Sequence, residues 1–79
     1  MTIRMYGAEW CSDCKRAKLY FDKQNVEYEY IDIDDDPNAT KIVRKANKGR
    51  RTIPTIFFED GSILVEPSNA ELAAKLGLS

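Results

Sequence analysis

Short runs of β-forming residues alternate along the chain with segments that have the period of a helix. Residues 2–6 predict a first strand, which a loop follows. From residue 11 the apolar positions recur at helical spacing, and this predicts a helix that ends near Asn25. The face of this helix consists of Cys14, Ala17, Lys18 and Phe21, of which only the lysine is not apolar. In residues 26–33 acidic and apolar side chains alternate, which predicts a strand with one wetter face near a sheet edge.

A second helix has a well-defined predicted start. Asp36 can accept hydrogen bonds from the free N–H groups of the first turn, and Pro37 suits the first helical position because it has no N–H to lose. We expect this helix to end at Gly49. Its predicted apolar stripe consists of Ala39, Ile42, Val43 and Ala46.

The last third of the chain predicts a hairpin and a third helix. Residues 55–58 and 63–65 are typical of strands, and Asp60-Gly61 between them is typical of a tight turn. Residues 68–71 have the Ser-x-x-Glu pattern of a capping box, so a helix is expected to begin here and to end at Gly77. Its predicted buried residues are Leu72 and Leu76.

These elements follow one another in the order β-α-β-α-β-β-α. A β-α-β unit pairs its strands in parallel through a right-handed crossover, and a hairpin pairs its strands antiparallel. The sequence therefore predicts a small α/β fold in which three helices flank a mixed four-stranded sheet. No linker, repeat or low-complexity stretch divides the chain, so we expect residues 1–79 to form a single domain.

Charge balance and residue usage exclude several classes of function. The 79 residues include 12 Lys and Arg against 13 Asp and Glu, far from the basic excess of a general nucleic-acid binder. The chain has no His, which excludes His-based acid–base catalysis and His-containing metal sites. No apolar run approaches the roughly 20 residues of a membrane helix, and the N-terminus is too short and too polar for a signal peptide. We therefore expect a cytoplasmic protein.

The candidate chemistry is concentrated in residues 10–14, Trp-Cys-Ser-Asp-Cys. Two cysteines three residues apart approach disulfide distance when the first lies at the N-terminal end of a helix and the second lies one turn further on. The helix dipole and the free N–H groups favour negative charge at that end, so Cys11 should be partly thiolate near neutral pH. Cys14 lies on the apolar face, where its thiol should stay protonated. The pattern predicts a nucleophilic Cys11 and a resolving Cys14.

Two other uses of a cysteine pair remain open. A zinc site needs four ligands, and with two cysteines and no His the others would have to be carboxylates. A structural disulfide that closes so short a loop stabilises a fold little in the chain-entropy model. A Cys-x-x-Cys that follows a strand and opens a helix of a β-α-β unit favours thiol–disulfide chemistry over both.

Over nearly its whole length the sequence resembles the glutaredoxins of the thioredoxin superfamily. The shared motifs are the Trp-Cys-x-x-Cys segment at residues 10–14, Thr52-Ile53-Pro54 before a strand, Asp60-Gly61-Ser62 in the hairpin, and residues 67–72 at the last helix. The Trp-Cys start, the Asp-Gly-Ser hairpin and the Pro-Ser before the last helix are especially similar to the mycoredoxin-like branch. The resemblance implies a thioredoxin-like fold of the glutaredoxin type and a thiol–disulfide oxidoreductase.

A substrate site around a cis-proline is also implied by this resemblance. It places a cis peptide bond before Pro54, beside Cys11, and implies that the backbone of Ile53 pairs with the cysteinyl part of an extended substrate. The local sequence alone would favour an ordinary trans proline at a strand start. Trp10 is expected to be exposed for partner contact, whereas Arg51 could bind a carboxylate or belong to a solvated cluster. The candidate substrate-binding residues are Trp10, Arg51, Thr52, Ile53, Pro54, Ser68 and Asn69.

Two departures from the glutaredoxin pattern concern the small thiol that serves as co-substrate. Glutathione-using members usually carry a Lys three residues before the first Cys, where this chain has Ala8. They also carry Gly-Gly and then acidic residues before the last helix, where this chain has Pro-Ser-Asn-Ala at residues 67–70. Both usual charged handles for glutathione are therefore absent, and a sugar-linked or other low-molecular-weight thiol, or reduction by a thioredoxin reductase, becomes a candidate. The expected co-substrate is a low-molecular-weight thiol: glutathione, mycothiol or a similar compound.

Together these features predict a cytoplasmic enzyme of electron transport and cell redox homeostasis. It would reduce protein disulfides, or mixed disulfides with small thiols, through the redox-active pair Cys11–Cys14. We expect a monomer with no bound cofactor or metal, whose partners are disulfide-containing proteins and small thiols and include neither nucleic acid nor membrane. One alternative is an electron donor recycled by thioredoxin reductase, for instance to a ribonucleotide reductase. Another is a non-catalytic binding module that joins two chains around a metal through Cys11.

Overall fold

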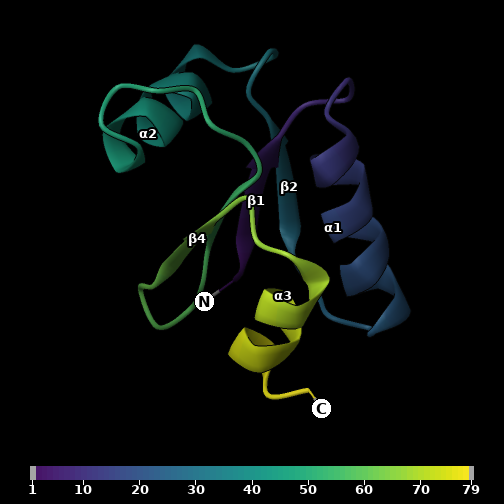
Figure 1. Ribbon diagram of the computed structural model, residues 1–79. Helices are drawn as coiled ribbons and strands as arrows, with labels where there is room; N and C mark the ends of the chain where they lie inside the picture. Colours follow the sequence, from purple (N-terminus) through teal and green to yellow (C-terminus); the bar gives the residue numbers. More distant parts are fainter. Residues whose placement is uncertain (1, 79) are drawn as a thin grey trace.

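A mixed four-stranded sheet with the strand order β2-β1-β3-β4 forms the centre of the computed structural model, which describes residues 2–78 (Figure 1). Its strands are β1 (Arg4–Gly7), β2 (Glu29–Asp32), β3 (Thr55–Phe57) and β4 (Ile63–Val65). β1 pairs in parallel with β2 and antiparallel with β3, and β3 pairs antiparallel with β4. The predicted topology is confirmed: a parallel β-α-β unit, with β2 at a sheet edge, and a C-terminal hairpin.

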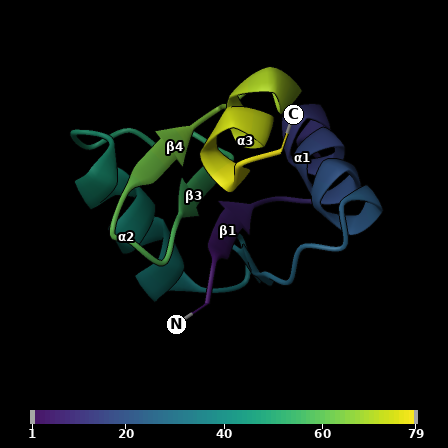
Figure 2. The ribbon, with the colours of Figure 1, turned by 90° about the horizontal axis from the view of Figure 1, so that it is seen from below.

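Three helices cover the two faces of this sheet. They are α1 (Ser12–Lys23), α2 (Pro37–Ala46) and α3 (Asn69–Leu76). α1 and α3 lie side by side against one face, and α2 lies against the other (Figure 2). The buried cluster beneath α1 and α3 includes Met5, Phe21, Ile56 and Leu72. The cluster on the α2 side includes Tyr6, Ile33, Ala39 and Val43, together with both cysteines.

Local capping interactions fix several helix ends where the sequence predicts them. Asp36 Oδ1 accepts a backbone N–H of the first turn of α2 at 2.9 Å, and Pro37 opens the helix. At α3 the Glu71 N–H donates to Ser68 Oγ at 3.1 Å, and the Ser68 N–H donates to Glu71 Oε1 at 2.9 Å. Gly77 ends α3 with a left-handed φ of 74°. These are short-range effects, which explains why the sequence alone predicts them.

The predicted start of the second strand, residue 26, is wrong. β2 begins at Glu29, because the chain needs residues 25–28 to leave α1. Asn25 takes a left-handed φ of 56°, and the Val26 N–H still bonds to the Phe21 carbonyl oxygen at 3.0 Å. Only then does the Glu29 N–H reach the edge of β1, where it donates to the Ile3 carbonyl oxygen at 2.8 Å.

The predicted end and apolar stripe of the second helix are also partly wrong. α2 ends at Ala46 rather than Gly49, because the side-chain amide of Asn47 donates to the Val43 carbonyl oxygen at 2.9 Å and closes the helix there. Ala39 and Val43 are buried as predicted, but Ile42 is 41% exposed. The buried row of α2 consists of Ala39 and Val43, and Ile42 lies outside it.

Candidate functional site

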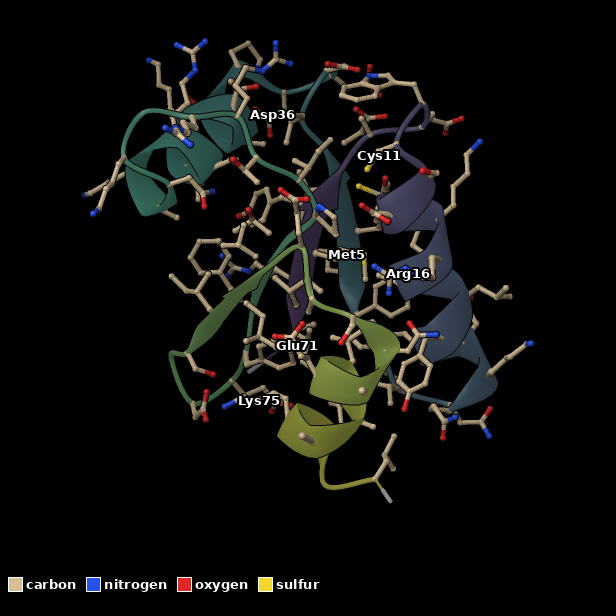
Figure 3. The ribbon with its side chains drawn as sticks, viewed as in Figure 1. Met5, Cys11, Arg16, Asp36, Glu71 and Lys75 are labelled. Carbon is tan, nitrogen blue, oxygen red and sulfur yellow. The ribbon has the colours of Figure 1, made fainter. Side chains whose placement is uncertain are left out.

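Cys11 lies in the turn between β1 and α1, at the carboxyl ends of the two parallel strands. Figure 3 shows it at the end of α1 that adjoins the tops of β1 and β2. Cys11 is the N-cap residue of α1, with an extended backbone (φ −92°, ψ 112°), and its carbonyl oxygen accepts the Lys15 N–H at 3.1 Å. A strand that ends directly before a helix therefore brings this side chain to the positive end of the helix dipole.

The Cys11 sulfur accepts a hydrogen bond from the backbone N–H of Cys14 at 3.2 Å. A helix N-terminal amide and the helix dipole both stabilise negative charge at this end of α1. Asp13 in the first turn opposes it, but one Asp13 oxygen lies 3.6 Å from the Arg16 guanidinium, which offsets part of that charge. The exposed fraction of Cys11 is 9%, against 0% for Cys14, so Cys11 is the sulfur on the outer side.

Cys14 is a buried, protonated thiol one helical turn behind Cys11. Burial raises the pKa of the Cys14 thiol to about 12, and its hydrogen bond with Cys11 acts in the same direction. At neutral pH, well below that value, the proton therefore stays on the sulfur. Both cysteines are free thiols in the structure. The two sulfurs thus have different environments, as the sequence predicts.

Gly7, at the end of β1, gives Cys14 the space that it occupies. A Cβ on Gly7 would lie 2.8 Å from Cys14 Sγ and 2.8 Å from the Tyr30 hydroxyl oxygen, closer than real Cβ contacts. Burial raises the pKa of Tyr30, and a negative charge on the nearby Cys14 would raise it further. Neither Gly7 nor Tyr30 is a site residue predicted from the sequence, and only a glycine at a strand end hints at the close approach.

Replacing Gly7 with alanine is expected to destabilise the protein by about 1–3 kcal/mol, because the added methyl group must displace the Cys14 sulfur in a filled core. Backbone entropy alone predicts the opposite, a small stabilisation. Equilibrium denaturation measures the difference. The same Gly7→Ala change in a Cys14→Ala background should cost less, since the colliding sulfur is gone. An equal loss in the two backgrounds would contradict this role of Gly7.

The loop before β3 brings Ile53 and Pro54 against Cys11. The Ile53–Pro54 peptide bond is cis, as the resemblance implies. Cys11 Sγ lies 4.0 Å from the Ile53 carbonyl oxygen. The Thr55 hydroxyl donates to the Thr52 carbonyl oxygen at 2.7 Å. The N–H of Glu66, directly after β4, donates to the Pro54 carbonyl oxygen at 2.9 Å. The loop is therefore held on both sides of the cis bond.

Two further candidate residues, Trp10 and Arg51, are joined by Asp34, which the sequence does not single out. Trp10 Nε1 donates to Asp34 Oδ2 at 2.7 Å, and an Arg51 guanidinium nitrogen lies 3.1 Å from Asp34 Oδ1. The Trp10 side chain is exposed, as predicted. These contacts link three loops at the end of the sheet where Cys11 lies.

The side chains of Ser68 and Asn69, by contrast, form hydrogen bonds at the start of α3. Ser68 forms both bonds of the capping box, and Asn69 Oδ1 accepts a hydrogen bond from Arg16 at 2.8 Å. Arg16 also donates to the Pro67 carbonyl oxygen at 2.9 Å and so ties α1 to α3. Within residues 2–78, no hydrogen bond connects Ser68 or Asn69 to Cys11.

A cleft of about 450 Å³ opens beside α2 and the loop that carries Arg51. It is lined by Ile33, Asp34, Pro37, Thr40, Lys41, Arg44 and Arg51. The lining residue Asp34 bonds to Trp10, the residue before Cys11, which links the cleft to the cysteine-bearing loop. Its polar lining combines three cations and a hydroxyl with one carboxylate, which suits a polar ligand that both donates and accepts hydrogen bonds.

Metal ligands do not gather in the part of the chain that the structure describes. In residues 2–78, no three or more Cys, Asp or Glu side chains come together in a way that could hold a metal ion. None of the helices in that range has the length and apolar character of a membrane span.

The chain is similar in sequence to several known proteins. The family model described as Glutaredoxin matches residues 3–63. Mycoredoxin 1 of Corynebacterium glutamicum is 35% identical over 74 residues, which cover 94% of this chain and 91% of that protein. A Mycobacterium tuberculosis protein that carries a glutaredoxin name is 38% identical over 74 residues, 94% of this chain and 88% of that one.

Solved structures show the same fold. The thioredoxin-like protein BC3987, as its T8A mutant, superposes with a TM-score of 0.82 at 24% identity over 94% of this chain and 97% of its own. The glutaredoxin grx-1 of Archaeoglobus fulgidus superposes with a TM-score of 0.78 at 23% identity over 96% of this chain and 87% of its own. The predicted thioredoxin-like fold of the glutaredoxin type is confirmed.

Proposed function

Because this chain belongs to the glutaredoxin family and is a thiol–disulfide oxidoreductase, we propose that Cys11 is its nucleophile and Cys14 its resolving cysteine. The observation that carries this assignment is the 3.2 Å hydrogen bond from the Cys14 N–H to the Cys11 sulfur. It supports an anion on Cys11, while burial keeps the proton on Cys14.

The reaction then proceeds in two exchanges. The Cys11 thiolate attacks one sulfur of the substrate disulfide; a bond forms between them, the substrate S–S bond breaks, and the departing sulfur leaves as a thiolate that takes up a proton. In the second exchange Cys14 gives up its proton and attacks the Cys11 sulfur, which releases the second substrate thiol. The substrate gains two electrons, and the protein is left with a Cys11–Cys14 disulfide.

A shorter route serves mixed disulfides of proteins with a small thiol. Cys11 attacks the sulfur of the small thiol, and the protein thiol leaves with a proton. A second molecule of small thiol then attacks the mixed disulfide on Cys11, which frees Cys11 and forms the disulfide of the small thiol. Cys14 takes no part in this route.

The substrate backbone is proposed to dock along the loop before β3. Ile53 lies beside Cys11, and within residues 2–78 its N–H has no hydrogen-bond partner, so an extended substrate can pair with it. Pro54 next to it has no N–H of its own to compete. Thr52 and Arg51 belong to this loop, and Trp10 is linked to it through Asp34; all three are proposed to contact the substrate. Ser68 and Asn69 retain at most a supporting role, because the α3 cap already uses their side chains.

As co-substrate we favour a sugar-linked thiol such as mycothiol over glutathione. A similar protein bears the name Mycoredoxin 1, and this chain has Ala8 where glutathione-using members usually carry Lys. Glutathione presents two carboxylates, and Arg16, a cation that reaches the start of α3, already bonds to Asn69 and to the Pro67 carbonyl oxygen. The mixed donors and acceptor of the cleft beside α2 suit a polyhydroxylated sugar.

A coupled assay offers each reductant in turn: mycothiol with its reductase, glutathione with its reductase, and thioredoxin reductase alone. Turnover with mycothiol is expected to exceed turnover with glutathione by about 10-fold or more, which corresponds to the loss of one charge-assisted contact. Equal or faster turnover with glutathione would contradict the choice of thiol. Turnover with thioredoxin reductase alone would support an electron donor, for example to a ribonucleotide reductase.

We propose that residues 1–79 act as a single domain, since the matched relatives align along 94% of the chain, and that this domain acts as a monomer. A reactive dithiol stays reduced only in a reducing compartment, which supports a cytoplasmic location and a part in electron transport and redox homeostasis.

A further inference from the structure

Asp34 bridges the two loops that flank Cys11. One carboxylate oxygen accepts a hydrogen bond from Trp10 Nε1 at 2.7 Å, and the other lies 3.1 Å from the Arg51 guanidinium. Trp10 immediately precedes Cys11, and Arg51 stands two residues before Ile53, whose carbonyl oxygen is 4.0 Å from the Cys11 sulfur. Trp10 and Arg51, the two contact residues that the sequence predicts, therefore bind the same carboxylate.

The backbone at Asp34 is in turn held by the end of the sheet. The Ile33 N–H donates to the Gly7 carbonyl oxygen at 2.9 Å, which continues the β1–β2 pairing one residue beyond β2. The Asp34 N–H then donates to Asp32 Oδ1 at 2.8 Å. The Trp10 side chain, in contrast, is 68% exposed and would rotate freely without a partner. Asp34 is therefore held at the end of β2, and its two contacts restrict the movement of Trp10 and Arg51 on two other loops.

We propose that Asp34 is a positioning residue for substrate binding: before the substrate arrives it holds the indole of Trp10, the residue next to Cys11, and the Arg51 guanidinium in the cleft beside α2. The inference rests on the proposed function of Cys11. Because both side chains are ordered in advance, the substrate does not have to immobilise them. The loss of Asp34 should therefore weaken substrate binding and leave the sulfur exchange itself almost unchanged.

Single-turnover kinetics test this division. Pre-reduced protein is mixed with a fluorogenic peptide disulfide at a series of peptide concentrations, so that no small-thiol reductant is needed. Asp34→Ala is expected to raise the half-saturating peptide concentration about 5-fold and to keep the limiting rate within about 2-fold. Asp34→Asn keeps an oxygen for the Trp10 N–H but loses the charge that faces Arg51, so an intermediate value is expected.

Asp35→Ala is the matched control. Asp35 is the exposed neighbour in the same turn, and its side chain forms no hydrogen bond or ion pair with any of residues 2–78. This variant is expected to match the wild-type protein. A half-saturating concentration that rises no more in Asp34→Ala than in Asp35→Ala would overturn the proposal, as would a loss confined to the limiting rate.

The indole N–H gives a readout that does not depend on turnover. Trp10 is the only tryptophan of the chain, so a ¹⁵N-labelled sample has one indole N–H resonance. In Asp34→Ala this resonance should move upfield and exchange faster with solvent, whereas in Asp34→Asn it should stay near its wild-type position. An unchanged resonance in Asp34→Ala would overturn the proposal.

Should Asp34→Ala fail to fold, the Trp10→Phe variant tests whether the indole N–H contributes to substrate binding. Phenylalanine keeps an aromatic ring but has no N–H, so Trp10→Phe should raise the half-saturating concentration in the wild-type background. In Asp34→Asn the further rise should be the same, since the amide oxygen of the new side chain still holds the indole. An absence of any effect of Trp10→Phe would overturn the proposal. Turnover that survives in Cys11→Ser would instead overturn the proposed function of Cys11. The Trp10 indole resonance does not depend on that result, so the two failures can be told apart.

Discussion

Cys11→Ser is expected to lower the rate of disulfide reduction by more than about 1,000-fold, with protein disulfides and small-thiol mixed disulfides alike. A serine hydroxyl stays protonated at neutral pH and cannot form the mixed disulfide with which both routes begin. The environment that stabilises a sulfur anion, the Cys14 N–H at 3.2 Å and the end of α1, is not enough to ionise a hydroxyl at neutral pH. A spectrophotometric turnover assay with each type of substrate measures the loss.

The same substitution carries its own structural control. Serine is among the preferred N-cap residues, so it can accept the same backbone N–H and should keep the free energy of unfolding within about 1 kcal/mol of the wild-type value. Loss of activity in a protein of unchanged stability then reflects the missing sulfur. Activity within about 10-fold of wild type would contradict the assignment of Cys11 as the nucleophile.

Cys14→Ser is expected to separate the two routes. Reduction of protein disulfides should fall by about 100-fold or more, because nothing in the protein can then displace the substrate from Cys11. Turnover of mixed disulfides with the small thiol should stay within about 3-fold of wild type, because the small thiol itself resolves the intermediate. The serine is close in size to the cysteine, and the backbone N–H that bonds to the Cys11 sulfur is retained.

Mass spectrometry of the stalled reaction gives the matching observation. In Cys14→Ser the substrate should remain attached to Cys11, and in the wild-type protein it should not accumulate. An equal loss of both activities would show that Cys14 is needed for the first exchange. Full retention of both would show that it resolves neither.

Sequence was sufficient where the deciding interactions are local. The N-cap at Asp36, the capping box of Ser68 and Glu71, and the left-handed Gly77 each depend on neighbours within a few residues, and the structure has all of them. The different environments of Cys11 and Cys14 follow in the same way from one helix start and one apolar face.

What the sequence could not supply depends on contacts between distant elements. The exposure of Ile42 depends on how much of the sheet α2 covers, and the late start of β2 depends on how the chain leaves α1. The close approach of Gly7 to Cys14 and the contacts of Asp34 likewise exist only once the strands are side by side. The cis bond before Pro54 is implied by the family resemblance and not by the local residues, which would favour trans.

Both proposed routes depend on one outer sulfur that is ionised, and the longer route also needs an inner sulfur that keeps its proton until the second exchange. Alkylation of the reduced protein with limiting iodoacetamide, followed by peptide mapping at a series of pH values, measures both. Near neutral pH Cys11 should be labelled first and almost alone, and labelling of Cys14 should become appreciable only as the pH approaches its raised pKa of about 12. Labelling of Cys14 before Cys11, or of both at the same rate near neutral pH, would contradict the two assignments.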